Sequence, residues 1–386
     1  MKKIIVFGST GSVGQNALKV IGKNKGKFKV TGLCTNKNIK VLLSQIKEFS
    51  PSYVCVRDQA QADKIGKSLE KRIRLFKGEK GLEEFAALES DISLMAISGI
   101  SCLKPLLINI KYAKRIALAN KESIVAAGSL VFKEAKKFHT EILPIDSEIN
   151  ALFQLINISK NGKCMNGNFR KVYLTASGGA LVDYTKKELA NVGIKQVLAH
   201  PTWKMGKRIT VDSATLVNKA FEVIETHYFF GIPFKDIGIT IHKESAVHAL
   251  VEFKDNTLLA CIYPPDMRKP ISFALHYPQR FNSGKRLDFS NSFSYSFSPI
   301  NYDKYPLIEI VLGAAKRKDN GLVVLNACDE VAIDYFLGQR IKFTDIYKAM
   351  AHIYSKYPRH KVKNINDVFF WDNWARIKTK DYLNRL

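Results

Sequence analysis

The chain has 386 residues, enough for two or three domains with a substantial hydrophobic core. Lys and Arg outnumber Asp and Glu by 60 to 35, but they are spread along the chain without a dense block, an arm or an aromatic RNA-binding signature, which argues against a nucleic-acid partner and favours small phosphates. The lack of an apolar run of about 18 residues, of a signal or transit segment and of any CxxC pair among six scattered cysteines predicts a cytoplasmic protein with reduced thiols and no membrane partner.

Short apolar strands alternate with amphipathic helices over residues 1–145, a pattern that predicts a doubly wound parallel sheet of the Rossmann type. The expected strands are 4–7, 30–34, 53–56, 92–97, 115–118 and 141–145, with helices at 41–49 and 61–69 among those between them.

The second part, residues 146–279, predicts a mixed α+β domain that carries a catalytic site. Its expected elements are a helix near 150–158, a strand at 172–177, a helix after Ser213, and strands near 237–241 and 246–263. A linker rich in Ser, Phe, Tyr and Asn is expected at 280–303, and a helical domain at 304–386.

The first strand runs directly into a glycine-rich turn, Gly8-Ser-Thr-Gly11-Ser-Val-Gly14, followed by a helical pattern. Glycines at such a turn allow close approach of a pyrophosphate and close packing of helix on strand, with the phosphates at the helix N-terminus. The spacing is GxxGxxG and not GxGxxG, so the dinucleotide interpretation depends on support from elsewhere in the chain.

That support lies at the end of the second strand, where an NAD-specific protein places an acid on the ribose 2′-hydroxyl. Here the chain has Asn36-Lys37-Asn38 and no acid. A Lys attracts a 2′-phosphate, so these residues predict NADPH, although an ordinary polar loop is the alternative.

A loop carrying His200, Trp203, Met205 and Gly206 precedes an apolar pair, a Ser and a helical segment. On that segment Asn218, Lys219 and Glu222 share one stripe of the helix, which suits an anionic substrate beside a cation. A solvated helix face is the simpler interpretation of the stripe alone.

Two carboxylates, Asp146 and Glu148, follow the last strand of the parallel sheet. In an extended segment they project to the same side, and a third carboxylate completes a hard oxygen site for Mg²⁺ or Mn²⁺. An acidic helix N-terminus capped by Ser147 is the alternative. Ser177-Gly178-Gly179 ends a later strand and can hold a phosphate or form a plain turn.

Taken together, the motifs GSTGSVG, LANKES, DSE, ASGG, HPTWKMG and DSATLVNKAFEVIE resemble those of the 1-deoxy-D-xylulose 5-phosphate reductoisomerase family. They occur in the family's order and separations over residues 1 to about 275, and the length and helical C-terminus also agree. Several independent motifs in order are far more specific than any one of them.

The resemblance implies roles for individual residues. For NADPH it indicates Thr10, Gly11, Ser12, Val13, Asn36, Lys37, Asn38, Asn120, Lys121, Glu122 and Gly206. For the divalent metal (Mg²⁺, Mn²⁺ or Co²⁺) it indicates Asp146, Glu148 and Glu222. For the substrate it indicates Lys121, Ser147, Glu148, Ser177, His200, Ser213, Asn218, Lys219 and Glu222, with Trp203 and Met205 as a lid. Lys121, Glu148, His200 and Glu222 are the expected catalytic residues. The chain departs from the family pattern at four positions. Asn36 and Ala176 stand where the family often has Gly, Ile149 where it often has His, and Thr202 where it often has Asn.

The implied reaction is the rearrangement of 1-deoxy-D-xylulose 5-phosphate and its reduction by NADPH to 2-C-methyl-D-erythritol 4-phosphate, an isoprenoid precursor step, in a homodimer. One alternative is another NADP-dependent reductase, of the homoserine or semialdehyde type, but no cysteine here sits beside a plausible base in sequence. The other is a nucleotide-binding sensor without catalysis, which has no reason to combine DSE with NKxxE.

Overall fold

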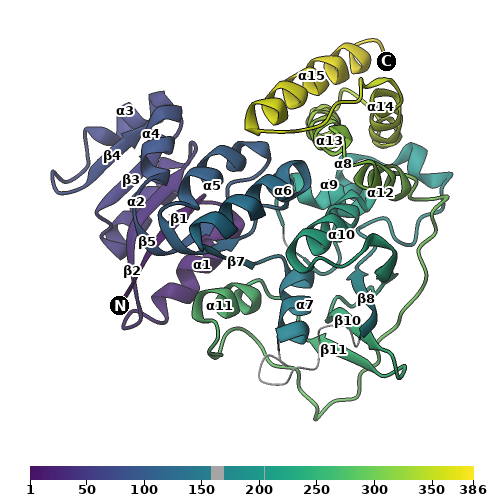
Figure 1. Cartoon of the computed structure of the whole chain (residues 1–386), viewed down its shortest axis with the longest axis horizontal. Coiled ribbons are helices and arrows are strands. Elements are labelled where there is room, and N and C mark those ends of the chain that lie inside the picture. The colour runs from purple at the N-terminus through teal and green to yellow at the C-terminus, as the bar shows by residue number, and fades with distance from the viewer. Residues whose placement is uncertain (158–168, 204) are drawn as a thin grey trace. The chain divides into compact units, whose positions relative to one another are not determined.

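The computed structural model describes residues 1–157, 169–203 and 205–386 (Figure 1). Three positions of the sequence analysis lie outside these residues: residue 158 at the end of the helix predicted near 150–158, Cys164, and residue 204 of the predicted lid. By its internal contacts the chain divides into two compact units: residues 1–123, 129–150 and 266–284 form the first, and the second holds 124–128, 151–265 and 285–386. The division into four sequence segments stays a prediction.

The first unit is built on a seven-stranded parallel sheet in the order β4-β3-β2-β1-β5-β6-β7. Its strands are β1 (Lys2–Phe7), β2 (Phe28–Thr35), β3 (Tyr53–Val56), β4 (Arg74–Lys77), β5 (Ser90–Met95), β6 (Ala113–Leu118) and β7 (Glu141–Pro144). The doubly wound fold is therefore confirmed. One strand, β4, was not predicted, because its four residues alternate too briefly to stand out from the charged residues around them.

Helices connect these strands: α1 (Ser12–Gly22), α2 (Ile39–Phe49), α3 (Gln59–Gly66), α4 (Gly78–Ala86), α5 (Leu103–Asn109) and α6 (Lys121–Phe138), and α11 (Arg268–His276) belongs to the same unit. The buried strands β1 and β5 are the neighbours at which the strand order reverses. In open α/β sheets this reversal is where ligands bind, at the carboxyl ends of the strands.

The second unit contains a four-stranded sheet in the order β11-β10-β8-β9. These strands are β8 (Phe169–Ala176), β9 (Ile237–Ile241), β10 (Val247–Phe253) and β11 (Leu258–Ile262). Strand β8 is parallel to β9 and antiparallel to β10. The predicted long strand at 246–263 is two strands joined by a turn around Asn256, which has a φ of +66°.

Helices of the second unit are α8 (Ile194–Val197), α9 (Lys207–Thr215), α10 (Val217–Phe230), α12 (Leu307–Arg317), α13 (Gly321–Leu337), α14 (Phe343–Lys356) and α15 (Ile365–Leu383). A large apolar core joins α9 and α10 to the C-terminal helices, with Phe221, Val324 and Phe343 inside it. Helix α7 (Ser147–Asn157) begins in the first unit and continues into the second. Within the described residues, no helix is long and apolar enough to cross a membrane.

Candidate active site

The turn between β1 and α1 is packed as a dinucleotide-binding turn requires. Gly8 has a φ of +74°, and a Cβ there would lie 2.4 Å from the carbonyl oxygen of Ala96, just beyond β5. A Cβ on Gly14 would lie 2.3 Å from the carbonyl oxygen of Gly8. Gly11 is exposed and precedes α1 without a side-chain cap. The outer glycines therefore close the turn, and the N-terminus of α1 beside Thr10, Ser12 and Val13 suits a phosphate.

The predicted 2′-phosphate region follows β2. The side chain of Lys37 is 71% exposed, and its ammonium lies 3.7 Å from the carboxylate of Asp58. Asn38 caps α2 by accepting a hydrogen bond from the Val41 amide, and the carbonyl of Asn36 accepts one from the Asp58 amide. Sequence inspection missed Asp58, since only the neighbouring strand β3 brings it beside Lys37. Lys37 remains accessible to an anionic ligand.

Asn120 and Glu122 hold the loop after β5 by hydrogen bonds, a role that the sequence motif did not indicate. The buried Asn120 amide donates to the carbonyls of Ile97 and Gly99, each at 3.0 Å, and to Glu122. Glu122 in turn accepts from the Gly99 amide. These side chains fix the loop after β5, at the edge of the sheet where the glycine turn lies. Their direct contact with a cofactor stays a prediction.

The DSE segment lies at the start of α7. The helix begins at Ser147, so the prediction of an extended segment there was wrong, and Glu148 lies in the first turn of α7. The Asp146 carboxylate pairs with the Lys121 ammonium at 2.5 Å, and both side chains are at most 10% exposed. The Ser147 hydroxyl donates to Glu148.

The segment before the NKxxE stripe also differs from the prediction. Residues 207–215 form α9, and α10 starts separately at Val217 because Leu216 between them is left-handed, with a φ of +59°. The shared stripe on α10 is confirmed. The Asn218 amide and the Lys219 ammonium both bond to the Glu222 carboxylate, which is 2% exposed.

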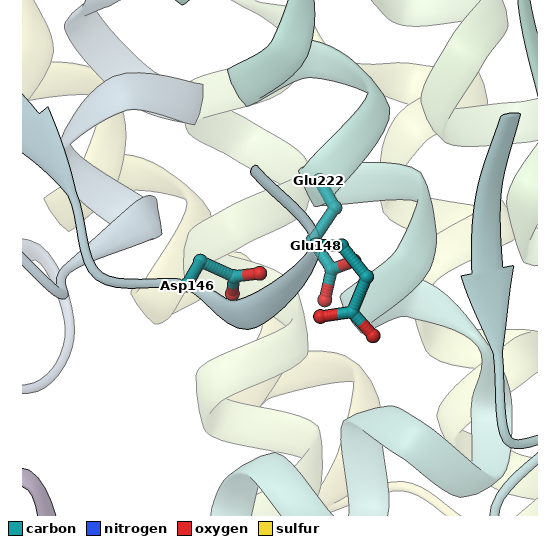
Figure 2. A group of neighbouring side chains, drawn as sticks. All are labelled: Asp146, Glu148 and Glu222. Carbon is teal, nitrogen blue, oxygen red and sulfur yellow. The ribbon is translucent and has the colours of Figure 1, made fainter. Parts of the chain in front are cut away.

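Asp146, Glu148 and Glu222 form a cluster, with one carboxylate oxygen from each lying within 4.8 Å of the other two (Figure 2). Three all-oxygen ligands at this spacing fit a hard divalent cation such as Mg²⁺ or Mn²⁺. Converging carboxylates repel one another. Lys121 and Lys219 relieve that repulsion here, a role that the sequence did not indicate for either residue.

The loop after β8 requires glycine at two consecutive positions. Gly178 and Gly179 have φ values of +81° and +69°. A Cβ on Gly179 would lie 2.6 Å from the carbonyl oxygen of Ser213 on α9, and one on Gly178 would lie 2.3 Å from Val182. The close packing brings the Ser177 loop against α9, as a phosphate site built from Ser177 and Ser213 requires.

Hydrogen bonds at His200 define the state of its ring. Nδ1 accepts from the amides of Thr202 and Trp203, at 3.2 and 3.0 Å. Burial lowers the pKa of His200, so the neutral ring carries its proton on Nε2 and donates it to Ser177 Oγ, 2.9 Å away. Ser177 Oγ also accepts from the Gly179 amide. With both acceptor positions used, its own proton is directed outward and can be donated to an anion.

The predicted lid is held near the second sheet. The half-buried Trp203 ring packs edge-to-face on His248, with centroids 6.1 Å apart, and Thr202 bonds to Ser245. Met205 is half-buried as well. Gly206 is exposed, with a φ of −64° and no atom within 4 Å of an added Cβ, so its backbone does not require glycine. The hinge at Gly206 stays a prediction.

The departures from the family pattern leave the elements regular. Ala176 pairs with Ile241 at the end of β8, and Ile149 is fully buried on α7. Thr202 keeps its backbone bond to His200.

Lys304 is a further residue that the sequence did not single out. Its ammonium donates to the carbonyls of Leu181 and Val182, at 2.7 and 2.8 Å, and so holds the chain just after the glycine pair. No local motif marks a lysine that acts 122 residues away, so only the fold could find it.

Three family models match the chain: 1-deoxy-D-xylulose 5-phosphate reductoisomerase at residues 4–128, its C-terminal domain at 142–230, and a DXP reductoisomerase C-terminal domain at 262–378. The chain belongs to the 1-deoxy-D-xylulose 5-phosphate reductoisomerase family. A reductoisomerase of Thermodesulfovibrio yellowstonii is 43% identical over 98% of this chain and 99% of its own length. One from a Sulfurihydrogenibium species is 42% identical over 96% and 95%.

Solved structures of reductoisomerases have the same fold. The Zymomonas mobilis enzyme in complex with NADPH is 32% identical, covers both chains completely and has a TM-score of 0.91. A reductoisomerase in complex with NADPH, fosmidomycin and magnesium is also 32% identical, over 100% of this chain and 98% of its own, with a TM-score of 0.92. Family and fold are thus confirmed, and the roles of individual residues stay predictions.

Proposed function

We propose that the chain catalyses the NADPH- and divalent-metal-dependent rearrangement and reduction of 1-deoxy-D-xylulose 5-phosphate to 2-C-methyl-D-erythritol 4-phosphate. The observation that carries the proposal is helix α10, on which Glu222 belongs to the carboxylate cluster and is bonded by Asn218 and Lys219. One helix therefore offers a metal ligand and two donors for an anionic substrate. The complexes of its relatives with NADPH, magnesium and fosmidomycin support the same assignment.

The site requires two further groups. The Gly8–Gly14 turn, the N-terminus of α1 and Lys37 would hold NADPH, which would supply the hydride for the reduction. Asp146, Glu148 and Glu222 would hold a divalent cation, which would supply positive charge for the substrate's oxygen atoms. Mg²⁺ is the ion in the relatives' structures, and the all-oxygen ligand set admits Mn²⁺ and Co²⁺ equally.

The chain's own residues bind and orient the substrate. The outward proton of Ser177, with donors from Ser213, Asn218 and Lys219, holds the phosphate, and the binding energy so obtained positions the carbon atoms that react. Lys121 and Ser147 hold the oxygen-bearing end beside Asp146 and Glu148. His200, neutral and protonated on Nε2, orients Ser177. It is also proposed as a catalytic residue beside the reacting centre.

The segment of Trp203 and Met205 acts as a lid that keeps water from the reactive intermediates. Replacement of Trp203 by Ala is expected to impair turnover without unfolding the protein, because the ring is only half-buried. Hydrogen exchange at residues 200–203, 205 and 206 should slow when a substrate analogue and NADPH bind. Exchange that is indifferent to both ligands, or a collapse of thermal stability in the variant, would instead assign Trp203 to the core.

The protein is further proposed to be a cytoplasmic homodimer. The edge strand β11 exposes Leu258, Leu259 and Ile262 at 54%, 45% and 43%. An exposed apolar edge is a pairing site, and a twofold axis lets it pair with its copy. Light scattering should give twice the chain mass, and Leu259→Lys should yield monomer. A monomeric wild type would contradict this proposal. Buried free thiols such as Cys34 and Cys55 suit a reducing compartment.

The experiment for the central proposal follows NADPH absorbance with purified protein and 1-deoxy-D-xylulose 5-phosphate, with identification of the product. Oxidation should require the sugar phosphate, and NADH should be a poor substitute. Amino-acid semialdehydes serve as control substrates, because they carry an aldehyde that NADPH can reduce but lack the phosphate. Oxidation with those substrates and none with the sugar phosphate would overturn the assignment.

A further inference from the structure

A partly buried ionic network joins α9 to the C-terminal helices. Arg208, on the first turn of α9, pairs with Glu330 of α13 at 2.8 Å, and it lies 3.8 Å from both Asp329 and Asp212. Glu330 is also paired by Arg376 of α15. Three helices that are distant in the sequence are thus held by one chain of charges.

The network is unexpected on α13, which is apolar on nearly all sides. Its polar exceptions include Asn326, Asp329 and Glu330, at positions i, i+3 and i+4, and they share one stripe. Asn326 and Asp329 are fully buried. Burying charge costs stability, and apolar side chains of similar size would hold the helices at least as firmly. Stability alone therefore does not account for these residues.

The charges nearly balance within the network. Burial and the neighbouring Asp212 raise the pKa of Asp329, which disfavours a negative charge there. Burial opposes ionisation of Glu330 too, but Arg208 and Arg376 outweigh it and hold the pKa of Glu330 below its usual range. Arg376 is further paired with Asp372 at 2.7 Å. Arg208 therefore faces an ionised Glu330 and binds it in a defined direction, as a guanidinium does.

The direction of the Arg208–Glu330 pair matters because α9 also carries Ser213, a residue of the proposed phosphate site. Arg208 and Asp212, one turn apart, lie on the face of α9 that meets α13. Ser213 is the next residue, about 100° further around the helix, and its carbonyl oxygen packs on Gly179 of the Ser177 loop. Rotation of α9 about its axis thus sets where Ser213 lies relative to Ser177. Through the left-handed Leu216 it also sets the start of α10.

We propose that Arg208 and Glu330 are positioning residues, which fix the rotation of α9 so that Ser213, Asn218 and Lys219 meet the substrate phosphate. The C-terminal helices thereby control phosphate recognition from outside the site. This inference rests on the proposed function, because it takes the phosphate of the sugar phosphate as the group recognised.

The test compares two substrates, 1-deoxy-D-xylulose 5-phosphate and its analogue without phosphate, 1-deoxy-D-xylulose. In Arg208→Met and Glu330→Gln, the ratio of kcat/KM for the phosphate ester to kcat/KM for the free sugar should fall on the order of 10-fold to 100-fold, since small displacements of binding groups have effects of that size. Arg208→Lys should recover part of the ratio. The matched control Asp372→Asn removes a charge from the α15 side of the network, and it should lower thermal stability while keeping the wild-type ratio.

A double variant separates position from stability. Arg208→Met with Glu330→Met replaces the ion pair by apolar side chains, which should restore folding if a single variant is unstable. The ratio should stay low in this folded double variant. A wild-type ratio there, or equal losses for both substrates in the single variants, would overturn the proposal.

Binding of inorganic phosphate, measured by calorimetry, distinguishes the failure of this inference from failure of the proposed function. Phosphate should bind the wild type and Asp372→Asn alike and should bind Arg208→Met about 10-fold more weakly or worse. If the wild type binds phosphate but does not turn over the sugar phosphate, the proposed function fails and the phosphate measurement still decides the role of Arg208. Equal phosphate affinity in all variants, or no binding to the wild type, would contradict it.

Discussion

The two units build their ligand sites by different means. In the first unit the nucleotide turn is formed by backbone: Gly8 and Gly14 lie where any side chain would collide with carbonyl oxygens. In the second unit the proposed phosphate site is formed by side chains that other side chains contact: His200 bonds to Ser177, and Arg208 of α9 pairs with Glu330. A backbone site is encoded within a few consecutive residues, whereas a side-chain site depends on partners far along the chain. Mutations should therefore impair the two kinds of site in different ways, through local residues in the first unit and through distant partners in the second.

The largest expected effect lies at Glu222, which belongs to the carboxylate cluster. Glu222→Gln keeps the shape of the side chain but deletes its charge, and its single amide oxygen can accept only one of the bonds from Asn218 and Lys219. We expect kcat to fall by about three orders of magnitude or more, because charge stabilisation in the transition state is lost. Steady-state kinetics and Mn²⁺ binding measure the loss.

NADPH affinity, measured in the absence of substrate, is the control for Glu222→Gln and should stay unchanged. Activity close to that of the wild type would contradict the metal assignment. A parallel loss of NADPH affinity would show that the variant disturbs the first unit as well.

The glycine pair sharpens the comparison, since it is a backbone feature of the proposed phosphate site. Gly179→Ala places a Cβ 2.6 Å from the Ser213 carbonyl oxygen at a φ of +69°, so the loop must shift away from α9. We expect the KM for the sugar phosphate to rise about 100-fold, as a displacement of about 1 Å can cause.

Gly313→Ala is the matched control for Gly179→Ala. Gly313 lies within α12 with open space around an added Cβ, and its replacement should stabilise the protein by about 0.5–1 kcal/mol without a change in KM. Thermal unfolding and kinetics on both variants make the comparison. An unchanged KM in Gly179→Ala would remove this loop from the phosphate site.

A substitution at Lys37 tests the proposed cofactor site of the first unit. Lys37→Glu puts a carboxylate beside Asp58, where a 2′-phosphate would be repelled. NADPH affinity should fall about 10-fold or more while NADH affinity changes little, because an exposed charge interaction that becomes repulsive is worth about 1–2 kcal/mol. Fluorescence titration with each cofactor measures both. Equal losses for the two cofactors would show that Lys37 does not recognise the 2′-phosphate.

The smallest effect concerns the pH dependence of the His200 turn. Burial lowers the pKa of His200 in the folded protein, so the unfolded chain binds the proton more readily. The contribution of His200 to stability is therefore complete above its usual pKa of 6.5 and is lost as the pH falls through the lower folded value. Protonation also removes the Nδ1 acceptor for Thr202 and Trp203. The stability difference between wild type and His200→Gln should shrink from pH 7.5 to pH 5, and a constant difference would contradict this account.

Local motifs explain how much of this molecule the sequence could predict. The glycine turn, the strands near it and the Asn218–Glu222 stripe depend on residues within a few positions of one another, and each was found. The break at Leu216 was missed, because a left-handed leucine has no sequence signature comparable to that of glycine. Asp58, Lys304 and Glu330 were missed for another reason: their partners are brought to them only by sheet order and helix packing.

The most direct measurement of the central claim is NADPH oxidation by the wild-type protein with 1-deoxy-D-xylulose 5-phosphate, first with Mg²⁺, then after exhaustive chelation, then with Mg²⁺ restored. The carboxylate cluster of Asp146, Glu148 and Glu222 predicts oxidation in the first state, none in the second and full recovery in the third. Undiminished oxidation after chelation, or no oxidation of NADPH with this substrate in any of the three states, would contradict it.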